Sequence, residues 1–194
     1  MSKTHIISIL IFLAFLSCKN LKDTHQHEKK KNIISEWSET KKDSLIVALA
    51  NMKTDTLDCT ADAYWQIIGQ GNSIIPNLLT HLTDTTTTNI YYVCKEGNLN
   101  IGELSYFALN TISDFPASMV TQIQFDLVYR KNEAPCWNFY RYFFNNENKA
   151  HYQEKAISFY EKSKFKFVKY SNSEITNCMK KYNIKGKYII KSSE

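Results

Sequence analysis

The chain has 194 residues, of which 43% are apolar, 13% aromatic and 22% charged, with only 5 Gly and 3 Pro. This composition excludes a disordered, collagen-like or low-complexity protein and indicates an ordinary globular domain. The net charge of +5 is unevenly distributed, because residues 54–148 hold 4 basic and 10 acidic side chains, whereas residues 149–194 hold 11 basic and 4 acidic ones. An acidic middle is therefore followed by a basic end.

The first residues have the pattern of an export signal. An apolar run over residues 6–16 reaches roughly 17 Å as a helix, too short to span a hydrocarbon core of about 30 Å. The run leads into Phe15-Leu16-Ser17-Cys18, which resembles the lipobox of bacterial lipoproteins. The resemblance implies that residues 1–17 are a signal peptide, cleaved after Ser17, and that Cys18 is lipidated. Acyl chains would then hold the protein on a membrane without a spanning helix.

Residues 18–35 are polar and lack apolar periodicity, which predicts a flexible tether with a span of roughly 25 Å. The tether contains His25 and His27, but a metal site needs further ligands and supporting contacts, so no metal or other cofactor is predicted. The run Lys29-Lys30-Lys31 is expected to be a solvated spacer that is attracted to anionic lipid.

From residue 36 to residue 194 we expect one mainly helical domain. Apolar residues recur at helical spacing, and Ser73 is the expected N-cap of a helix that carries Pro76 in its first turn. The predicted helices span approximately residues 36–52, 61–69, 73–84, 102–112, 116–125, 135–144, 149–162 and 173–182, the last with Ser173 as its cap. Alternation over residues 164–169 and the apolar segment 187–190 predict two short strands, and thus a small C-terminal β pairing.

Two of these segments resemble a known repeat. The sequence GNSIIPNLLTHLTD at residues 71–84 is similar to the second helix of a HEAT-type repeat, and GELSYFALNTI at residues 102–112 is similar to the first helix of a following one. The resemblance covers residues 61–113, about one and a half repeats, and implies a short stack of antiparallel helices. Because about three repeats are usually needed to bury a core, we expect irregular flanking helices to close the stack.

A long connection, residues 85–101, separates the two repeat-like segments. Long connections without secondary structure are uncommon in compact domains and are often functional. Four of its side chains suit an adaptable protein-binding surface: Tyr91, Tyr92, Asn98 and Asn100. We weigh equally the alternative that the connection is an insertion held down by its apolar residues, Ile90, Val93 and Leu99.

Four cysteines remain besides Cys18, and an even number in an exported protein predicts two disulfides. These are Cys59, Cys94, Cys136 and Cys178, for which the sequence leaves three pairings open. The absence of a CxxC motif argues against a zinc site or a thioredoxin-like redox pair. A disulfide between Cys94 and a helix would pin the long connection.

The sequence contains no GxSxG, Walker A, HExxH or GxGxxG motif. Four carboxylates come into question for glycoside hydrolysis, but their spacing selects no pair: Glu96, Glu103, Asp114 and Asp126. Only Arg130 and Arg141 are arginines among 24 basic residues, which argues against nucleic-acid binding. We expect the basic end either to face an anionic membrane or wall polymer, or to pack on the acidic middle.

Together these patterns predict a lipoprotein of the bacterial cell envelope, lipid-anchored to a membrane, with its domain in the periplasm or at the cell surface. We expect a non-catalytic module that binds a partner protein through the long connection, and an immunity or inhibitor protein is one form of such a module. The alternative is an envelope hydrolase that acts on wall or glycan polymers. That activity would require a cleft with two close carboxylates or a Cys–His contact.

Overall fold

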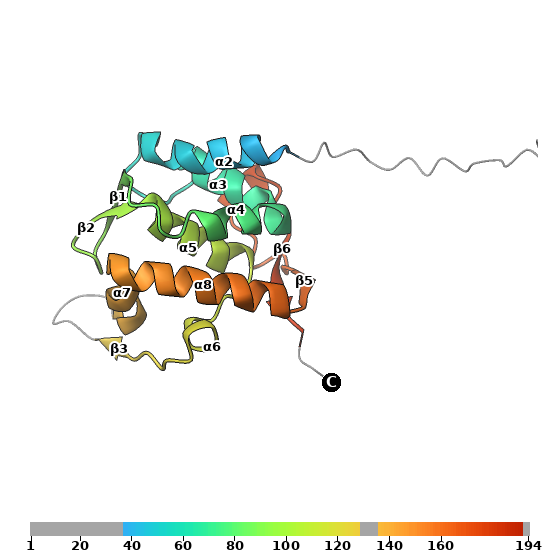
Figure 1. Cartoon of the computed structure of the whole chain (residues 1–194). Coiled ribbons are helices and arrows are strands. Elements are labelled where there is room, and N and C mark those ends of the chain that lie inside the picture. Colours follow the sequence, from blue (N-terminus) through green and yellow to red (C-terminus); the bar gives the residue numbers. More distant parts are fainter. Residues whose placement is uncertain (1–36, 129–135, 192–194) are drawn as a thin grey trace, which may run out of the picture. The chain divides into compact units, whose positions relative to one another are not determined.

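A computed structural model describes residues 37–128 and 136–191 (Figure 1). Cys18, the predicted signal peptide and the predicted tether lie outside the described residues. The helices of the described part are α2 (Glu39–Val47), α3 (Asp62–Gly69), α4 (Ile75–Thr80), α5 (Ile101–Ile112), α6 (Ala117–Thr121), α7 (Asn138–Phe143), α8 (Asn146–Lys162) and α9 (Asn177–Lys181), with 3-10 turns η1 (Ala48–Asn51) and η2 (Gly71–Ile74). The strands form antiparallel pairs, β1 (Thr87–Tyr92) with β2 (Gly97–Asn100), β3 (Leu127–Val128) with β4 (Cys136–Trp137), and β5 (Phe165–Lys169) with β6 (Gly186–Ile190). The mainly helical class and the C-terminal β pairing are thus confirmed.

Helix α5 is the central element of the core. It packs against α2, α3, α4 and β6, and nine of its 12 residues are buried. Small side chains permit this close packing: a Cβ atom at Gly102 would lie only 2.3 Å from the carbonyl oxygen of Leu82. The helix begins with a capping box, in which the Asn100 side chain accepts from the Glu103 amide and the Glu103 carboxylate accepts from the Asn100 amide.

A cluster of buried aromatic rings joins α5, α7 and α8. Tyr106 of α5 lies 4.9 Å from Phe139 and 4.8 Å from Phe143, both on α7, and 5.6 Å from Tyr152 on α8. All four residues are at most 1% exposed. Such tilted and edge-to-face pairs stabilise a core beyond the area they bury. The aromatic side chains of α7 therefore close one side of the α5 core.

Two predicted caps are wrong. Ser73 lies within η2, where its hydroxyl donates to the Gln70 carbonyl (3.0 Å), so α4 begins only at Ile75 with Pro76 in its first turn. Ser173 lies in a turn, and Thr176 caps α9 instead by accepting from the Met179 amide (3.2 Å). In both cases local turns use the residues that were expected to start the helix, and the helix is shorter than predicted.

The connection 85–101 contains the β1–β2 hairpin, so the expectation of a segment without secondary structure is wrong. Along β1, Thr88 and Ile90 are buried whereas Thr87, Asn89 and Tyr91 are exposed. This alternation, together with β-branched and aromatic residues, is typical of a half-buried strand. The flanking helices, α4 and α5, pack directly against each other beside the hairpin.

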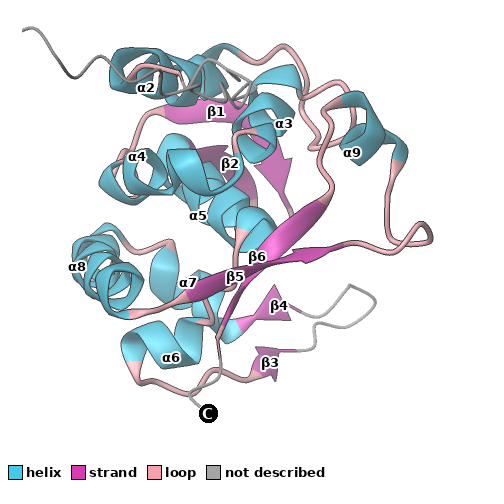
Figure 2. Ribbon diagram, turned by 90° about the vertical axis from the view of Figure 1, so that its right-hand side faces the viewer, coloured by secondary structure: helices cyan, strands magenta, loops and turns pink. Residues whose placement is uncertain are grey.

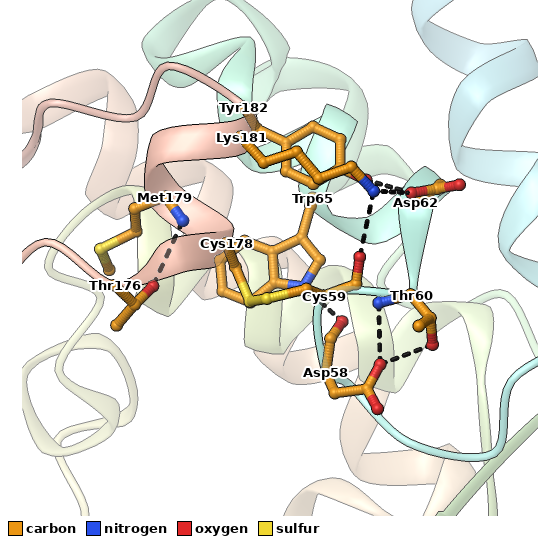
Figure 3. The surroundings of a disulfide bond; sticks show 10 residues. All are labelled: Asp58, Cys59, Thr60, Asp62, Trp65, Thr176, Cys178, Met179, Lys181 and Tyr182. Atoms are coloured by element: carbon orange, nitrogen blue, oxygen red, sulfur yellow. Dashed lines mark hydrogen bonds and ion pairs between the residues drawn. A yellow bond between two sulfur atoms is a disulfide. The ribbon is translucent and has the colours of Figure 1, made fainter.

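The acidic middle and the basic end of the chain pack on each other, as one of the two interpretations of the charge pattern predicted. Three ion pairs link them: Glu103–Lys149 (2.8 Å), Asp62–Lys181 (2.8 Å) and Asp114–Lys187 (3.1 Å). The second pair adjoins the Cys59–Cys178 disulfide, where the rings of Trp65 and Tyr182 are stacked at 6.5 Å (Figure 3). These contacts fasten α9 to the start of α3.

Candidate binding site at the hairpin

The β1–β2 hairpin is held by hydrogen bonds along both strands. Within it the Thr88 hydroxyl donates to the Leu99 carbonyl (2.8 Å), and Tyr91 lies opposite Asn98. At the outer edge of β1, the Asn89 side chain donates to the Met52 carbonyl (2.7 Å) and the Tyr91 amide donates to the Asp55 carbonyl (3.2 Å). Both edges of β1 are therefore paired.

The tip of the hairpin is fixed by a disulfide and an ion pair. Cys94 is bonded to Cys136 in β4, so the long connection is pinned, although to a short strand rather than to a helix. Next to it, the Lys95 ammonium lies 2.6 Å from the Glu103 carboxylate, which is 1% exposed and also contacts Lys149. Burial lowers the pKa of Lys149, and the bond to Glu103 counteracts this effect. The tip is thereby tied to β4 and to α5, and through Glu103 to α8.

A groove of about 550 Å³ runs beside the hairpin. Its walls come from β1, β2, α3, α5, α7 and the segment before α3. The lining residues are Thr56, Leu57, Tyr64, Ile90, Tyr91, Tyr92, Leu99, Phe107, Asn110, Thr111 and Tyr140. None of these is an acid or a base that is charged at neutral pH, so the groove presents an aromatic surface with hydroxyl and amide groups.

Burial favours the protonated form of two tyrosines of the groove, Tyr64 and Tyr92. Tyr92 forms edge-to-face contacts with Phe107 (5.2 Å) and Tyr140 (5.5 Å), and burial raises its pKa, as does the neighbouring Tyr140. Burial also raises the pKa of Tyr64 to about 12, against a smaller opposite effect of its hydrogen bond with Thr111 (3.3 Å). The Thr111 hydroxyl is held in place by its bond to the Phe107 carbonyl (2.9 Å).

The four residues proposed from the sequence divide into two pairs. Tyr91 is 56% exposed and lies opposite the exposed Asn98, so both are accessible to a partner. Tyr92 is half-buried among aromatic rings, and Asn100 is buried as the N-cap of α5, so the binding role expected for Asn100 is wrong. The signature of that cap was present in the sequence as Asn followed three residues later by Glu.

The alternative interpretation of the connection, an insertion held down by apolar residues, is confirmed in part. Ile90 and Leu99 are buried in the core, as an insertion held down by apolar residues requires, whereas Val93 is 43% exposed at the tip. The hairpin is thus both packed and partly accessible. Sequence reasoning missed Tyr64, Phe107 and Tyr140, because they come from three different helices and no spacing along the chain relates them.

The four carboxylates considered for hydrolysis are not brought together. Glu103 is buried in its ion pairs, and Asp114 pairs with Lys187 next to β6. Glu96 lies in the hairpin turn, and Asp126 precedes β3. All four cysteines of the described part are in disulfides, so none of them is a free thiol.

Another pair of carboxylates does converge: Glu39 and Asp43 of α2 both bind the side chain of Asn77 on α4. The Asn77 side-chain amide donates to Glu39 (3.0 Å) and to Asp43 (2.9 Å), and His81 Nε2 lies 3.7 Å from Asp43. The bond from Lys42 is the largest of the effects that lower the pKa of Glu39. A general acid in glycoside hydrolysis needs a raised pKa, so the environment of Glu39 favours a permanently charged surface carboxylate.

Comparisons with protein-family models, curated proteins and solved structures found no match to this chain. Within residues 37–128 and 136–191, no helix is long and apolar enough to cross a membrane. The same residues contain no group of three or more His, Cys, Asp or Glu side chains arranged to hold a metal ion. The two disulfides indicate an oxidising, extracytoplasmic location.

Proposed function

We propose that this protein is a lipoprotein of the bacterial cell envelope whose helical domain is a non-catalytic protein-binding module. The lipobox-like FLSC sequence supports lipidation of Cys18, and the disulfides fit export. Helices α3, α4 and α5 are proposed to correspond to the one and a half HEAT-like repeats, since α5 packs against both of the others. The partner is proposed to be a protein, and no nucleic acid or cofactor is proposed.

The observation that carries the binding role is a fixed hairpin beside an aromatic groove. A hairpin held at its tip by Cys94–Cys136 and along β1 loses little conformational entropy when it binds. Exposed Tyr91 offers a large contact area with few rotatable bonds, and Asn98 offers hydrogen bonds beside it. The groove, without charged groups at neutral pH, suits an apolar or aromatic side chain of the partner. The narrower proposal, an immunity or inhibitor protein, fits a preorganised loop of this kind.

The binding role is tested by crosslinking and capture from intact envelopes. Deleting residues 85–101 would remove Ile90 and Leu99 from the core, so the informative variant is Tyr91→Ala with Asn98→Ala. Phe167→Ala is the control, because Phe167 is a similarly exposed aromatic residue (47%) on β5, far from the hairpin (Figure 1). We expect a specific captured protein to be lost from the hairpin variant only. Identical captured sets for the wild type and both variants would refute the role of the hairpin.

The anchor is tested separately with Cys18→Ser. The mass of the N-terminal peptide should show acyl chains in the wild type, and the variant should lose stable membrane association. An unchanged membrane fraction in the variant would argue against lipid tethering.

The alternative, an envelope hydrolase, would have to use the carboxylates that converge on Asn77. Release of sugars from isolated wall or glycan polymers that disappears in Asp43→Asn would support it. Release that is absent, or unaffected by Asp43→Asn and Glu39→Gln, would exclude this cluster as a hydrolase site.

A further inference from the structure

Residues 164–191, which comprise β5, α9 and β6, are the most basic part of the described chain. We call the two paired strands β5 and β6, with Lys164 and Lys191 at their ends, the lysine ribbon. Residues 164–191 hold eight lysines and a single acidic residue, Glu174. Lys181 and Lys187 pair with acidic side chains of the middle segment. The other six have no carboxylate partner among the residues that the structure describes: Lys164, Lys166, Lys169, Lys180, Lys185 and Lys191. Four of these six lie on the ribbon or at its ends (Lys164, Lys166, Lys169 and Lys191), whereas Lys180 is on α9 and Lys185 precedes β6. The ribbon therefore carries positive charge that the acids of the described residues do not neutralise.

The two faces of the lysine ribbon differ. On the inner face, Phe165 stacks on Phe115 of the core (5.9 Å), and further along the strand Phe167 contacts Tyr188 (5.2 Å) but is 47% exposed. Because successive side chains of a strand alternate between faces, the register places the remaining positions on the outer face. These are Lys164, Lys166, Val168, Lys187, Ile189 and Lys191. The outer face thus carries Lys164, Lys166 and Lys191 around two aliphatic side chains, whereas Lys187 on this face is paired with Asp114.

Phosphate-rich membrane surfaces attract such a face. Each lysine close to an anionic lipid surface strengthens binding by about fivefold. Val168, 39% exposed, supplies apolar contact at the headgroup level. Pairing with another strand is less favoured, because lysines on an exposed strand edge oppose it. The surface carries lysine rather than arginine, which fits many diffuse phosphates better than one bidentate ligand.

The position of the lysine ribbon agrees with this occupant. The described chain begins at Trp37, immediately before α2, on the same side of the domain as β5 and β6 (Figures 1 and 2). The β1–β2 hairpin lies at the opposite end of the domain from the ribbon (Figure 1).

We propose that the outer face of the lysine ribbon docks on anionic lipid headgroups of the membrane that holds the protein. The location near a membrane rests on the lipid anchor of the proposed function, whereas the preference for anionic headgroups rests on the ribbon alone. Docking in this orientation turns the β1–β2 hairpin and its groove away from the membrane, where a partner protein can reach them.

The test is lysine footprinting of the full chain, isolated from envelopes and combined with vesicles of phosphatidylcholine, with or without phosphatidylglycerol. An amine-acylating reagent is applied, and mass spectrometry measures the acylation of Lys164, Lys166 and Lys191. The internal control is Lys53, an exposed lysine beyond η1. We expect phosphatidylglycerol to slow acylation of the ribbon lysines, high salt to restore it, and Lys53 to be unaffected. Binding to phosphatidylglycerol vesicles should weaken about fivefold in Lys166→Gln and less than about twofold in the matched variant Lys53→Gln.

Equal acylation with and without phosphatidylglycerol would overturn the proposal. Protection without vesicles that grows with protein concentration would also overturn it, in favour of strand pairing between copies. The mass of the N-terminal peptide reports separately whether Cys18 is lipidated. If it is not, the anchor fails, and ribbon protection on sedimented phosphatidylglycerol vesicles still supports the docking face. Failure of that unlipidated chain to sediment with the vesicles would overturn it.

Discussion

Replacing Lys149 with Met should destabilise the domain by about 3 kcal/mol. Lys149 and Glu103 are each 1% exposed, and their charged atoms are 2.8 Å apart. At an effective dielectric constant of about 20, this attraction amounts to about 6 kcal/mol. The variant also relieves the desolvation of the Lys149 ammonium, which costs several kcal/mol. In the variant, Glu103 keeps its bonds to Lys95 (2.6 Å) and to the Asn100 amide (2.9 Å). These bonds and the relieved desolvation together offset roughly half of the lost attraction, so the net loss of stability is about 3 kcal/mol.

Thermal and urea unfolding with intact disulfides measure this loss. A change of 3 kcal/mol should lower Tm by about 6 to 12 °C for a domain of this size. Lys155→Met, on the same helix and without an ion-pair partner among the described residues, should change stability by less than about 0.5 kcal/mol. The double variant Glu103→Gln with Lys149→Met should be more stable than Lys149→Met alone. In the double variant no buried negative charge lacks its positively charged partner. An unchanged Tm in Lys149→Met, or a double variant as unstable as the single one, would refute the reasoning.

Three further predictions concern the disulfides, the hairpin and the buried tyrosines. Removing Cys94–Cys136 (sequence separation 42) by paired Ala substitutions should lower the free energy of unfolding in urea by about 4 kcal/mol, because the disulfide closes a long loop. Removing Cys59–Cys178 (separation 119) should lower it by about 5 kcal/mol. Losses below about 1 kcal/mol would contradict this account. Asn100→Ala should cost about 1 kcal/mol through loss of the α5 cap, whereas Asn98→Ala should leave stability unchanged; equal effects of the two would contradict the assigned roles. Burial raises the pKa of Tyr64 to about 12, so the folded state favours the protonated side chain. The resulting stabilisation of about 2 to 3 kcal/mol is fully present below a pH of about 10 and is lost as the pH rises towards about 12. Stability curves against pH should therefore fall less steeply in this range for Tyr64→Phe than for the wild type, and parallel curves would show that Tyr64 ionises freely.

Much of the fold could be predicted because its signals are local. The amphipathic segment 149–162 lies within α8, and the alternating segment 164–169 pairs with 187–190 as β5 and β6. The hairpin at 85–101 was missed because its strands are short and polar on one side, so that β1 resembles a loop composed of Thr and Asn. Competing local turns explain the two wrong caps, since a serine can bond to its own turn as readily as to a following helix.

The candidate site was predictable only in part, for a different reason. Tyr91 and Asn98 could be proposed from residue type alone, but their pairing across the hairpin depends on its register. Nothing along the chain indicated that Tyr64, Phe107 and Tyr140 would join them in one groove. Lys149 also looked like an ordinary residue of a charged helix, although it is buried against Glu103, 46 positions away.

By itself, the sequence determined the helical class, the even number of cysteines and the opposite charges of the middle and the end, because composition and periodicity are properties of neighbouring residues. Only the tertiary structure decided which cysteines pair and which lysines form ion pairs with carboxylates. It also decided which lysines of the lysine ribbon have no carboxylate partner among the described residues. These outcomes depend on burial and on contacts between distant segments: a buried ion such as Lys149 requires a partner, whereas Lys166 on an exposed strand does not.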